Sequence, residues 1–258
     1  MKNIKALLAV SAIALAAGAV TVSSLTAATA PKPQAQDWSF QGLFGTFDRA
    51  ALQRGFQVYK NVCAGCHGLR HVAYRNLAAL GYTEDQIKAF AAEVEVQDGP
   101  NDNGEMFARK GKPSDRFKSP FPNEQAARAA NNGAYPPDLS VITKARLNGT
   151  DYMYALLTTY KEEPPKGMKM PEGMFYNEAF AGQQIAMVPP LAPDAVQYQD
   201  GTKATVPQMA KDVTTFLAWA AEPELEERKS MGRAVIIFLV VLTAFMYALK
   251  RKIWSDLH

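Results

Sequence analysis

The stretch NVCAGCHGLRHVAYR, residues 61–75, contains both cysteines of the chain and two of its three histidines. Cys63 and Cys66 are three positions apart, and His67 follows directly. This C-x-x-C-H spacing is typical of the attachment of a c-type haem. Two thioether bonds can hold the porphyrin edge against one helical turn, while the next side chain reaches the iron from one face. The stretch therefore predicts a haem site.

Two other kinds of site could use the same residues. A zinc site would combine Cys63, Cys66, His67 and His71, but structural zinc sites usually take their second pair of ligands from a separate segment. Adjacent Cys66 and His67 would also struggle to reach one tetrahedral centre. A thioredoxin-like dithiol is expected near a βαβ pattern, and no run of buried parallel strands surrounds this motif. Haem attachment is the favoured interpretation.

The segment before the motif, FDRAALQRGFQVYKNV, predicts the helix that carries it. Asp48 is a candidate N-cap, and Leu52, Phe56 and Tyr59 recur at helical spacing. Gly55 lies beside this apolar stripe, where a missing side chain would permit close approach of another helix. A tolerated surface glycine is the alternative.

Residues 1–30 have the pattern of a secretory signal peptide. Lys2 and Lys5 precede an apolar stretch from Ala6 to Val20, small residues follow, and no acidic side chain occurs. An uncleaved anchor helix is the less favoured alternative, because the apolar part is short and rich in alanine. We therefore expect residues 31–230 to form an exported domain.

The other end of the chain predicts a membrane anchor at residues 231–249. The run from Ala234 to Leu249 is apolar without interruption, and Lys250, Arg251 and Lys252 end it. A helix from Met231 to Leu249 would cover roughly 28 Å, enough for one bilayer crossing. A buried helix of a soluble domain would show a polar stripe, and none is present. Residues 250–258 are then a cytoplasmic tail.

The exported part is close to electrically neutral. The whole chain carries a formal charge of +3, but residues 31–233 hold 23 basic and 24 acidic side chains. A nucleic-acid-binding protein would show a basic face with interleaved aromatic residues, so we expect no nucleic acid as a partner. About two hundred residues are enough for one core and at most two small domains.

The second axial ligand of a haem at His67 must come from elsewhere in the chain. His71 is four residues away and would share a helical face with His67, and His258 follows the anchor. Five methionines lie in loop-like sequence, namely Met106, Met168, Met170, Met174 and Met187. Met187 is the best candidate, since two prolines after Val188 fix an extended backbone. The stretch PPKGMKMPEGM, residues 164–174, is the runner-up.

The rest of the domain reads as helices joined by long loops. Helices are predicted from Thr83 onward, over the start of residues 123–146, again after Pro137, and finally over residues 205–231, running toward the anchor. Residues 97–107 and 109–123 are rich in turn formers and predicted to be irregular. The segment from Ala89 to Ala108 includes five acidic and no basic side chains. It is interpreted either as a solvated loop or as a patch that steers a basic redox partner.

Several stretches together resemble the cytochrome c1 family, the haem subunit of the quinol–cytochrome c reductase complex. The resemblance covers nearly all of the chain after the signal peptide, and it includes SFQGLFGTFDRAALQRGFQVYKNVCAGCH, EVEVQDGPNDNGEMF, ARAANNGAYPPDLS, AMVPPL and ATVPQMAKDVTTFLAWAAEPE. It implies a mainly α fold, a class I cytochrome c-like domain with long loop insertions, plus one C-terminal transmembrane helix.

The resemblance also implies the site. One haem c would be covalently attached through Cys63 and Cys66, with His67 and Met187 as axial ligands. Arg128 would contact a haem propionate through a charge-assisted hydrogen bond. His/Met ligation leaves no open position on the iron, so the chemistry is outer-sphere, one-electron transfer. A peroxidase-like haem enzyme would instead need an open sixth position, and a thiol or metal protein would be colourless.

The partners follow from the same resemblance. The chain would be the electron-transfer subunit of a ubiquinol–cytochrome c oxidoreductase, with no catalytic chemistry of its own. It would take an electron from a Rieske iron-sulfur protein and pass it to a soluble or membrane-bound cytochrome c. Cytochrome b and the Rieske protein would share a dimeric membrane complex with it. The haem domain would lie on the periplasmic side of a bacterial inner membrane, cytoplasmic or photosynthetic, held there by a single crossing of the lipid bilayer.

Overall fold

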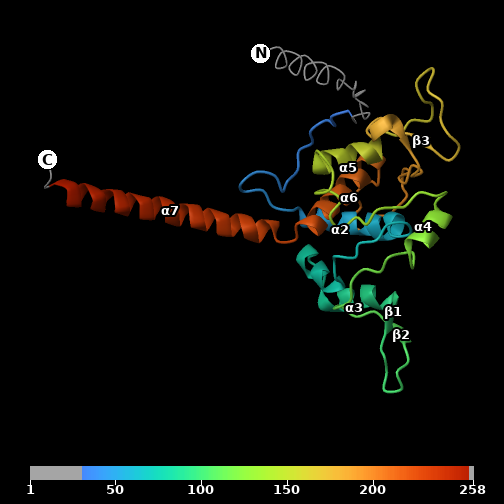
Figure 1. Cartoon of the computed structure of the whole chain (residues 1–258), viewed down its shortest axis with the longest axis horizontal. Coiled ribbons are helices and arrows are strands. Elements are labelled where there is room, and N and C mark those ends of the chain that lie inside the picture. The colour runs from blue at the N-terminus through green and yellow to red at the C-terminus, as the bar shows by residue number, and fades with distance from the viewer. Residues whose placement is uncertain (1–30, 256–258) are drawn as a thin grey trace, which may run out of the picture.

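The computed structural model describes residues 31–255, and the predicted signal peptide lies outside them. The described chain is mainly helical, as the sequence predicted, and its β structure consists of two antiparallel pairs of short strands and two isolated bridges (Figure 1). The six α-helices of this part are α2 (Arg49–Val58), α3 (Glu84–Ala92), α4 (Glu124–Ala130), α5 (Gly149–Thr158), α6 (Val206–Ala221) and α7 (Leu225–Trp254). The shorter helical turns are η1 (Tyr59–Cys63), η2 (Tyr74–Leu80) and η3 (Ala181–Gln183), and the strands are β1 (Glu95–Asp98), β2 (Phe107–Lys110), β3 (Phe175–Tyr176) and β4 (Gln184–Ile185).

Helices α2 and α3 begin at the caps that the sequence predicted. The Asp48 carboxylate accepts hydrogen bonds from the backbone N–H groups of Ala50 and Ala51, at 2.9 and 3.3 Å. Thr83 and Gln86 form a reciprocal capping box at the start of α3. Each cap satisfies backbone donors that the first helical turn leaves without a partner.

Helix α2 crosses α6 in close contact at Gly55. A Cβ atom on Gly55 would lie 2.1 Å from the Asp212 carbonyl oxygen and 2.7 Å from the Phe216 Cβ atom. The sequence-based expectation that Gly55 permits close approach of another helix is therefore confirmed. Beside this crossing the Arg54 guanidinium binds the buried Asp212 carboxylate through two nitrogens, at 3.0 and 3.1 Å. The two helices are thus in contact at Gly55 without spare volume, and the Arg54–Asp212 ion pair joins them beside this point.

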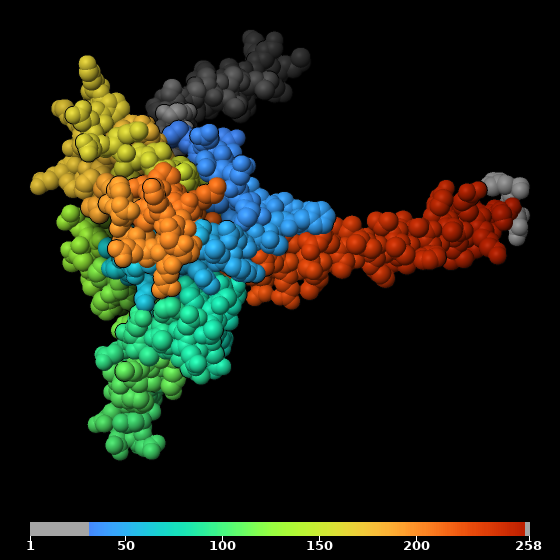
Figure 2. All heavy atoms as spheres, turned by 180° about the vertical axis from the view of Figure 1, so that it is seen from behind, coloured from blue at the N-terminus to red at the C-terminus, as the bar shows by residue number. Residues whose placement is uncertain are grey.

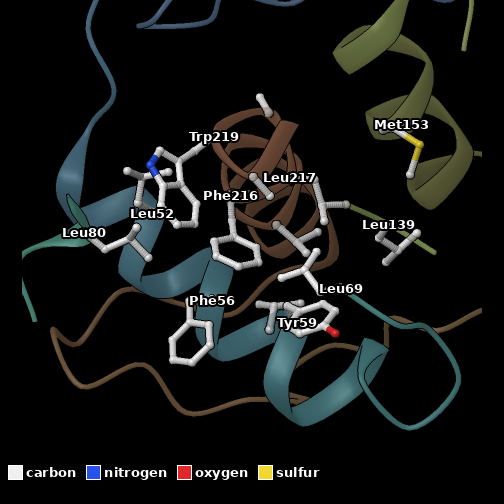
Figure 3. Close-up of a cluster of buried hydrophobic side chains, with 14 of the residues drawn as sticks. Leu52, Phe56, Tyr59, Leu69, Leu80, Leu139, Met153, Phe216, Leu217 and Trp219 are labelled. Atoms are coloured by element: carbon white, nitrogen blue, oxygen red, sulfur yellow. The ribbon is translucent and has the colours of Figure 1, made fainter. Parts of the chain in front are cut away.

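The core between α2 and α6 is aromatic. Phe216 lies at its centre, with its ring centroid 5.7 Å from each of the rings of Phe56, Tyr59 and Trp219 (Figure 3). All four side chains are at most 2% exposed. The apolar stripe predicted for residues 52–59 therefore faces the core.

Two loop segments differ from the sequence-based expectation. Strands β1 and β2 pair over four residues each, from Glu95↔Lys110 to Asp98↔Phe107, so the acidic segment is a projecting hairpin rather than an irregular loop (Figure 1). Arg109 holds the base of the hairpin, because its guanidinium binds the carboxylates of Asp98 and Asp115. The predicted helix directly after Pro137 is wrong: residues 140–148 form turns and bends, and α5 begins only at Gly149.

Asn177 ties the long segment between α5 and α6 to the end of α5. Its side chain is fully buried and donates a hydrogen bond to the Leu156 carbonyl oxygen at 2.8 Å. Its Oδ1 atom accepts from the backbone N–H groups of Ala179 and Phe180, at 3.0 and 3.1 Å. One amide therefore satisfies three backbone groups from two separate segments.

Helix α7 leaves the domain as a long rod (Figures 1 and 2). Leu225 at its start is buried, whereas none of its most apolar 18-residue window is buried, and the mean hydropathy of that window is 2.2. Its length and composition suffice for one membrane crossing, and it contains the predicted anchor at residues 231–249.

We predict that Gly55→Ala forces α2 and α6 apart and lowers the free energy of unfolding by about 1–3 kcal/mol, the usual cost of overpacking. Denaturant unfolding of the purified chain in detergent measures this loss. Gly232→Ala is the matched control, because a Cβ atom there meets nothing within 4 Å. Equal stability of the two variants would contradict the close crossing.

Asn177→Ala removes the buried amide and leaves its backbone partners unsatisfied. We expect a loss of about 3 kcal/mol in unfolding free energy, since each buried group without a hydrogen bond costs about 1–3 kcal/mol. Asn103→Ala, at an exposed position in the β1–β2 hairpin, should leave stability unchanged. A loss at position 177 no greater than at position 103 would show that these hydrogen bonds add nothing.

Candidate haem site

The C-x-x-C-H motif lies where α2 ends. After Val58 the chain widens into the π-helical turn η1, which ends at Cys63. The backbone N–H groups of Cys66 and His67 both donate to the Cys63 carbonyl oxygen, at 3.1 and 2.9 Å. The motif is therefore a compact turn fixed to the end of a core helix, as a covalently held planar group requires.

The two cysteines are free thiols. Cys63 is half-buried and packs against the hydrophobic core, whereas Cys66 is exposed. Burial, with a smaller effect of Cys66 beside it, raises the pKa of the Cys63 thiol to about 12. Two unpaired thiols on one turn, one against the core and one at the surface, are available for two thioether bonds.

His67 has the hydrogen bond that a metal-ligating histidine usually makes. Its Nδ1 atom lies 2.8 Å from the Pro137 carbonyl oxygen. A carbonyl can only accept, so Nδ1 carries the hydrogen and Nε2 keeps its lone pair. Such a bond fixes both the tautomer and the ring orientation of a ligand. Burial lowers the pKa of His67 against the opposing effects of Pro137 and Asp138, which favours the neutral imidazole that binds iron.

Residues 137–140 form a strap that runs beside the motif. The backbone N–H of Leu139 donates to the Gly68 carbonyl oxygen at 2.8 Å, and the N–H of Arg70 donates to the Asp138 carboxylate at 3.0 Å. A Cβ atom on Gly68 would come within 2.8 Å of that carboxylate. The strap therefore holds the backbone that follows His67 in one position.

The structure does not assemble the alternative zinc site. No group of three or more candidate ligands for a metal ion comes together within residues 31–255. His71 is exposed and lies in a turn, not on a continuation of the helix. The helical argument that set His71 aside therefore does not apply, and its exposure is the feature that now separates it from His67.

Met187 lies in the long segment between strand β4 and helix α6. It is half-buried and packs against the same hydrophobic core as Cys63. The Tyr160 hydroxyl donates to the Met187 carbonyl oxygen at 3.0 Å. Burial raises the pKa of Tyr160, so its hydroxyl keeps its proton and stays a donor. The backbone of Met187 is thus fixed by a contact that the sequence did not reveal.

The other candidate methionines differ in their surroundings. Met106 is 62% exposed in the turn of the β1–β2 hairpin. Met170 and Met174 line a cleft of about 700 Å³ together with Tyr160 and Pro189. The runner-up segment therefore lies next to the segment of Met187, and both belong to one region of the domain.

Arg128 is engaged on its own helix. Its guanidinium binds the Glu124 carboxylate at 2.7 Å and the Gly133 carbonyl oxygen at 2.8 Å, and it lies 5.6 Å from the centre of the Tyr135 ring. A propionate would have to share this guanidinium with Glu124. The role of Arg128 at the haem stays a prediction.

Three residues that support the site were not found from the sequence. Pro137 was named only as the residue after which a helix was expected, and not as the partner of His67. Asp138 and Tyr160 act on backbone groups distant in sequence, and neither lies in a recognisable motif. These residues fit a haem c, because two thiols can bond to the porphyrin, whereas a neutral imidazole with a free nitrogen and a thioether can bind its iron.

Comparison with known proteins identifies the family of this chain. The family model described as "Cytochrome C1 family" matches residues 38–257. Cytochrome c1 of Rhodospirillum rubrum is 52% identical over 236 residues, covering 86% of this chain and 87% of that protein. A mitochondrial cytochrome c1 heme protein of Solanum tuberosum is 55% identical over 222 residues, covering 85% and 84%.

A third relative is longer. The protein named cytochrome b/c1 of Bradyrhizobium diazoefficiens is 49% identical over 282 residues, which cover 100% of this chain but only 41% of that protein. The family match and the identities together show that this chain belongs to the cytochrome c1 family and is a haem-binding electron-transport protein.

Proposed function

We propose that the chain holds one haem c, bound covalently by Cys63 and Cys66, with His67 and Met187 as axial ligands. The observation that carries this proposal is the hydrogen bond between His67 Nδ1 and the Pro137 carbonyl oxygen, 2.8 Å long, which leaves Nε2 free for iron. Arg128 is proposed to contact a propionate in addition to Glu124.

The bound haem would supply a one-electron redox centre between a Rieske iron-sulfur protein and a soluble or membrane-bound cytochrome c. The protein's own residues provide rigidity for that exchange. The strap at residues 137–140 fixes His67, and Tyr160 fixes the backbone of Met187. Fixed ligands on both sides leave no open coordination position, which favours electron transfer over ligand binding.

The assembly proposed for this chain is a dimeric membrane complex with cytochrome b and the Rieske protein. A relative in Candida albicans, 49% identical over 239 residues, is named as a catalytic subunit of the cytochrome b-c1 complex. The Bradyrhizobium relative carries the name cytochrome b/c1. Both names support a cytochrome b as a neighbour of this chain.

The β1–β2 hairpin is proposed to steer the soluble partner. It projects from the domain (Figure 1), and Asp102 and Glu105 lie in its exposed turn. Glu93 and Asp98 instead pair with Lys60 and Arg109 at the base. An exposed negative tip on a rigid base would raise the encounter rate with a basic protein.

The haem domain is proposed to lie on the periplasmic side of a bacterial inner membrane. This orientation rests on the predicted signal peptide, on the haem attachment motif and on helix α7, which could cross the bilayer once. Lys250, Arg251 and Lys252 would then remain in the cytoplasm. Arg228, Lys229 and Arg233 precede the span, so charge alone does not set the orientation and the predicted signal peptide decides it.

The optical spectrum of the purified protein tests the ligand set. We expect sharp bands for the reduced haem and, in the oxidised protein, a sulfur-to-iron charge-transfer band. Met187→Leu should abolish the charge-transfer band and lower the reduction potential, because thioether ligation raises it. The haem should stay covalently attached in this variant.

Met174→Leu is the matched control, since Met174 is also partly buried and lines the neighbouring cleft. This variant should keep the charge-transfer band. If the band survived Met187→Leu and disappeared in Met174→Leu, the axial ligand would be reassigned to residues 168–174.

Tyr160→Phe removes the donor to the Met187 carbonyl oxygen while keeping the ring. A hydrogen bond is worth about 1 kcal/mol, so we expect added imidazole to displace the methionine at about fivefold lower concentration. Titration of the charge-transfer band measures this change. Tyr154→Phe on α5 should leave the titration unchanged, and equal midpoints for both variants would contradict the role of Tyr160.

A further inference from the structure

Residues 39–47 form a loop that is tied to the first turns of α7. The Phe47 backbone N–H donates to the Glu226 carboxylate at 2.7 Å. The Lys229 ammonium donates to the Gly45 carbonyl oxygen at 3.2 Å, and the Arg233 guanidinium donates to the Leu43 carbonyl oxygen at 3.0 Å. Figure 2 shows this blue segment lying along the start of the red helix. The loop therefore has a fixed position relative to α7.

The loop is built to hold an apolar tip away from the core. Gly42 has a φ of +72°, and a Cβ atom on Gly45 would lie 1.9 Å from the Gln41 carbonyl oxygen, so both positions require glycine. Between these glycines Leu43 is 56% and Phe44 is 75% exposed. Three aromatic residues on either side of this exposed pair, Trp38, Phe40 and Phe47, are buried. The exposed pair thus adds nothing to the core.

The tip lies level with the outer end of the apolar run of α7. Arg233, which binds the Leu43 carbonyl oxygen, is the last charged residue before Ala234. Its guanidinium also lies 5.4 Å from the centre of the Phe44 ring. The run from Ala234 to Leu249 covers about 24 Å, less than the roughly 30 Å of a bilayer's hydrocarbon layer. Apolar groups beside Arg233 would extend the membrane-facing surface at that end.

We propose that Leu43 and Phe44 insert into the interfacial layer of the lipid bilayer beside α7. Arg233 would then place its guanidinium near the lipid phosphates, with its stem among apolar groups. Aromatic residues gather at this depth of membranes. At the other end of the span, Trp254 follows the apolar run shortly after Leu249. The proposal rests on the membrane anchoring by α7 proposed above.

A photoreactive side chain at position 44 tests the proposal in the full chain within its native membrane. Phe44 is replaced by p-benzoylphenylalanine, and irradiation is followed by mass spectrometry of the purified chain. We expect a mass increase equal to one phospholipid. The same replacement of Phe245, which is 70% exposed on α7, should also yield a lipid adduct. Replacement of Met106, exposed in the β1–β2 hairpin, should yield none.

The outcomes separate the loop from the anchor. A crosslink from position 44 to a second polypeptide would make the loop a subunit contact and overturn the proposal. Lipid adducts at position 245 alone would place the loop in water, with the same consequence. Absence of lipid adducts at both positions would overturn the anchor and the loop proposal together. An unchanged haem spectrum in each variant shows that the domain is folded.

Discussion

The fold depends on the contact between α2 and α6 at Gly55. Because no side chain separates the two backbones there, Phe216 can enter the space between Phe56, Tyr59 and Trp219. Helix α2 ends directly in the turn that carries Cys63, so its position decides where the cysteine motif stands. A shift of α2 at its contact with α6 therefore also moves the turn that carries the candidate haem site.

The candidate site takes its precision from segments that are distant in sequence. The strap at residues 137–140 orients His67, whereas Tyr160 and Asn177 hold the segment that leads to Met187. These supports act mostly through backbone carbonyl and N–H groups, which do not titrate near neutral pH. Such a frame would keep the geometry of the proposed ligands constant as an electron arrives and leaves, which suits a protein of electron transport.

Sequence reasoning succeeded where the information was local. The cap at Asp48, the stripe at residues 52–59 and the exposed anchor helix were predicted, because each depends on neighbours within one or two turns. Gly55 was predicted to meet another helix only from its place beside the stripe, since its partner in α6 is distant in sequence. The wrong helix after Pro137 and the unforeseen β1–β2 hairpin depend on partners further along the chain. The contacts of Pro137 and Tyr160 with the ligand segments also span long separations. By contrast, the ion pair of Arg128 with Glu124 is an i, i+4 pair that the sequence could have revealed.

The connection between α6 and α7 is only residues 222–224, and the Arg49–Glu226 ion pair adds a second link across it. The domain therefore has little freedom to pivot on its stalk. If α7 tilts within the bilayer, the globular part tilts with it. Because membrane thickness affects the tilt of a spanning helix, it also affects the distance of the cysteine motif from the lipid surface. The proposed redox partners would therefore meet the domain at a height above the membrane that depends on the tilt of α7.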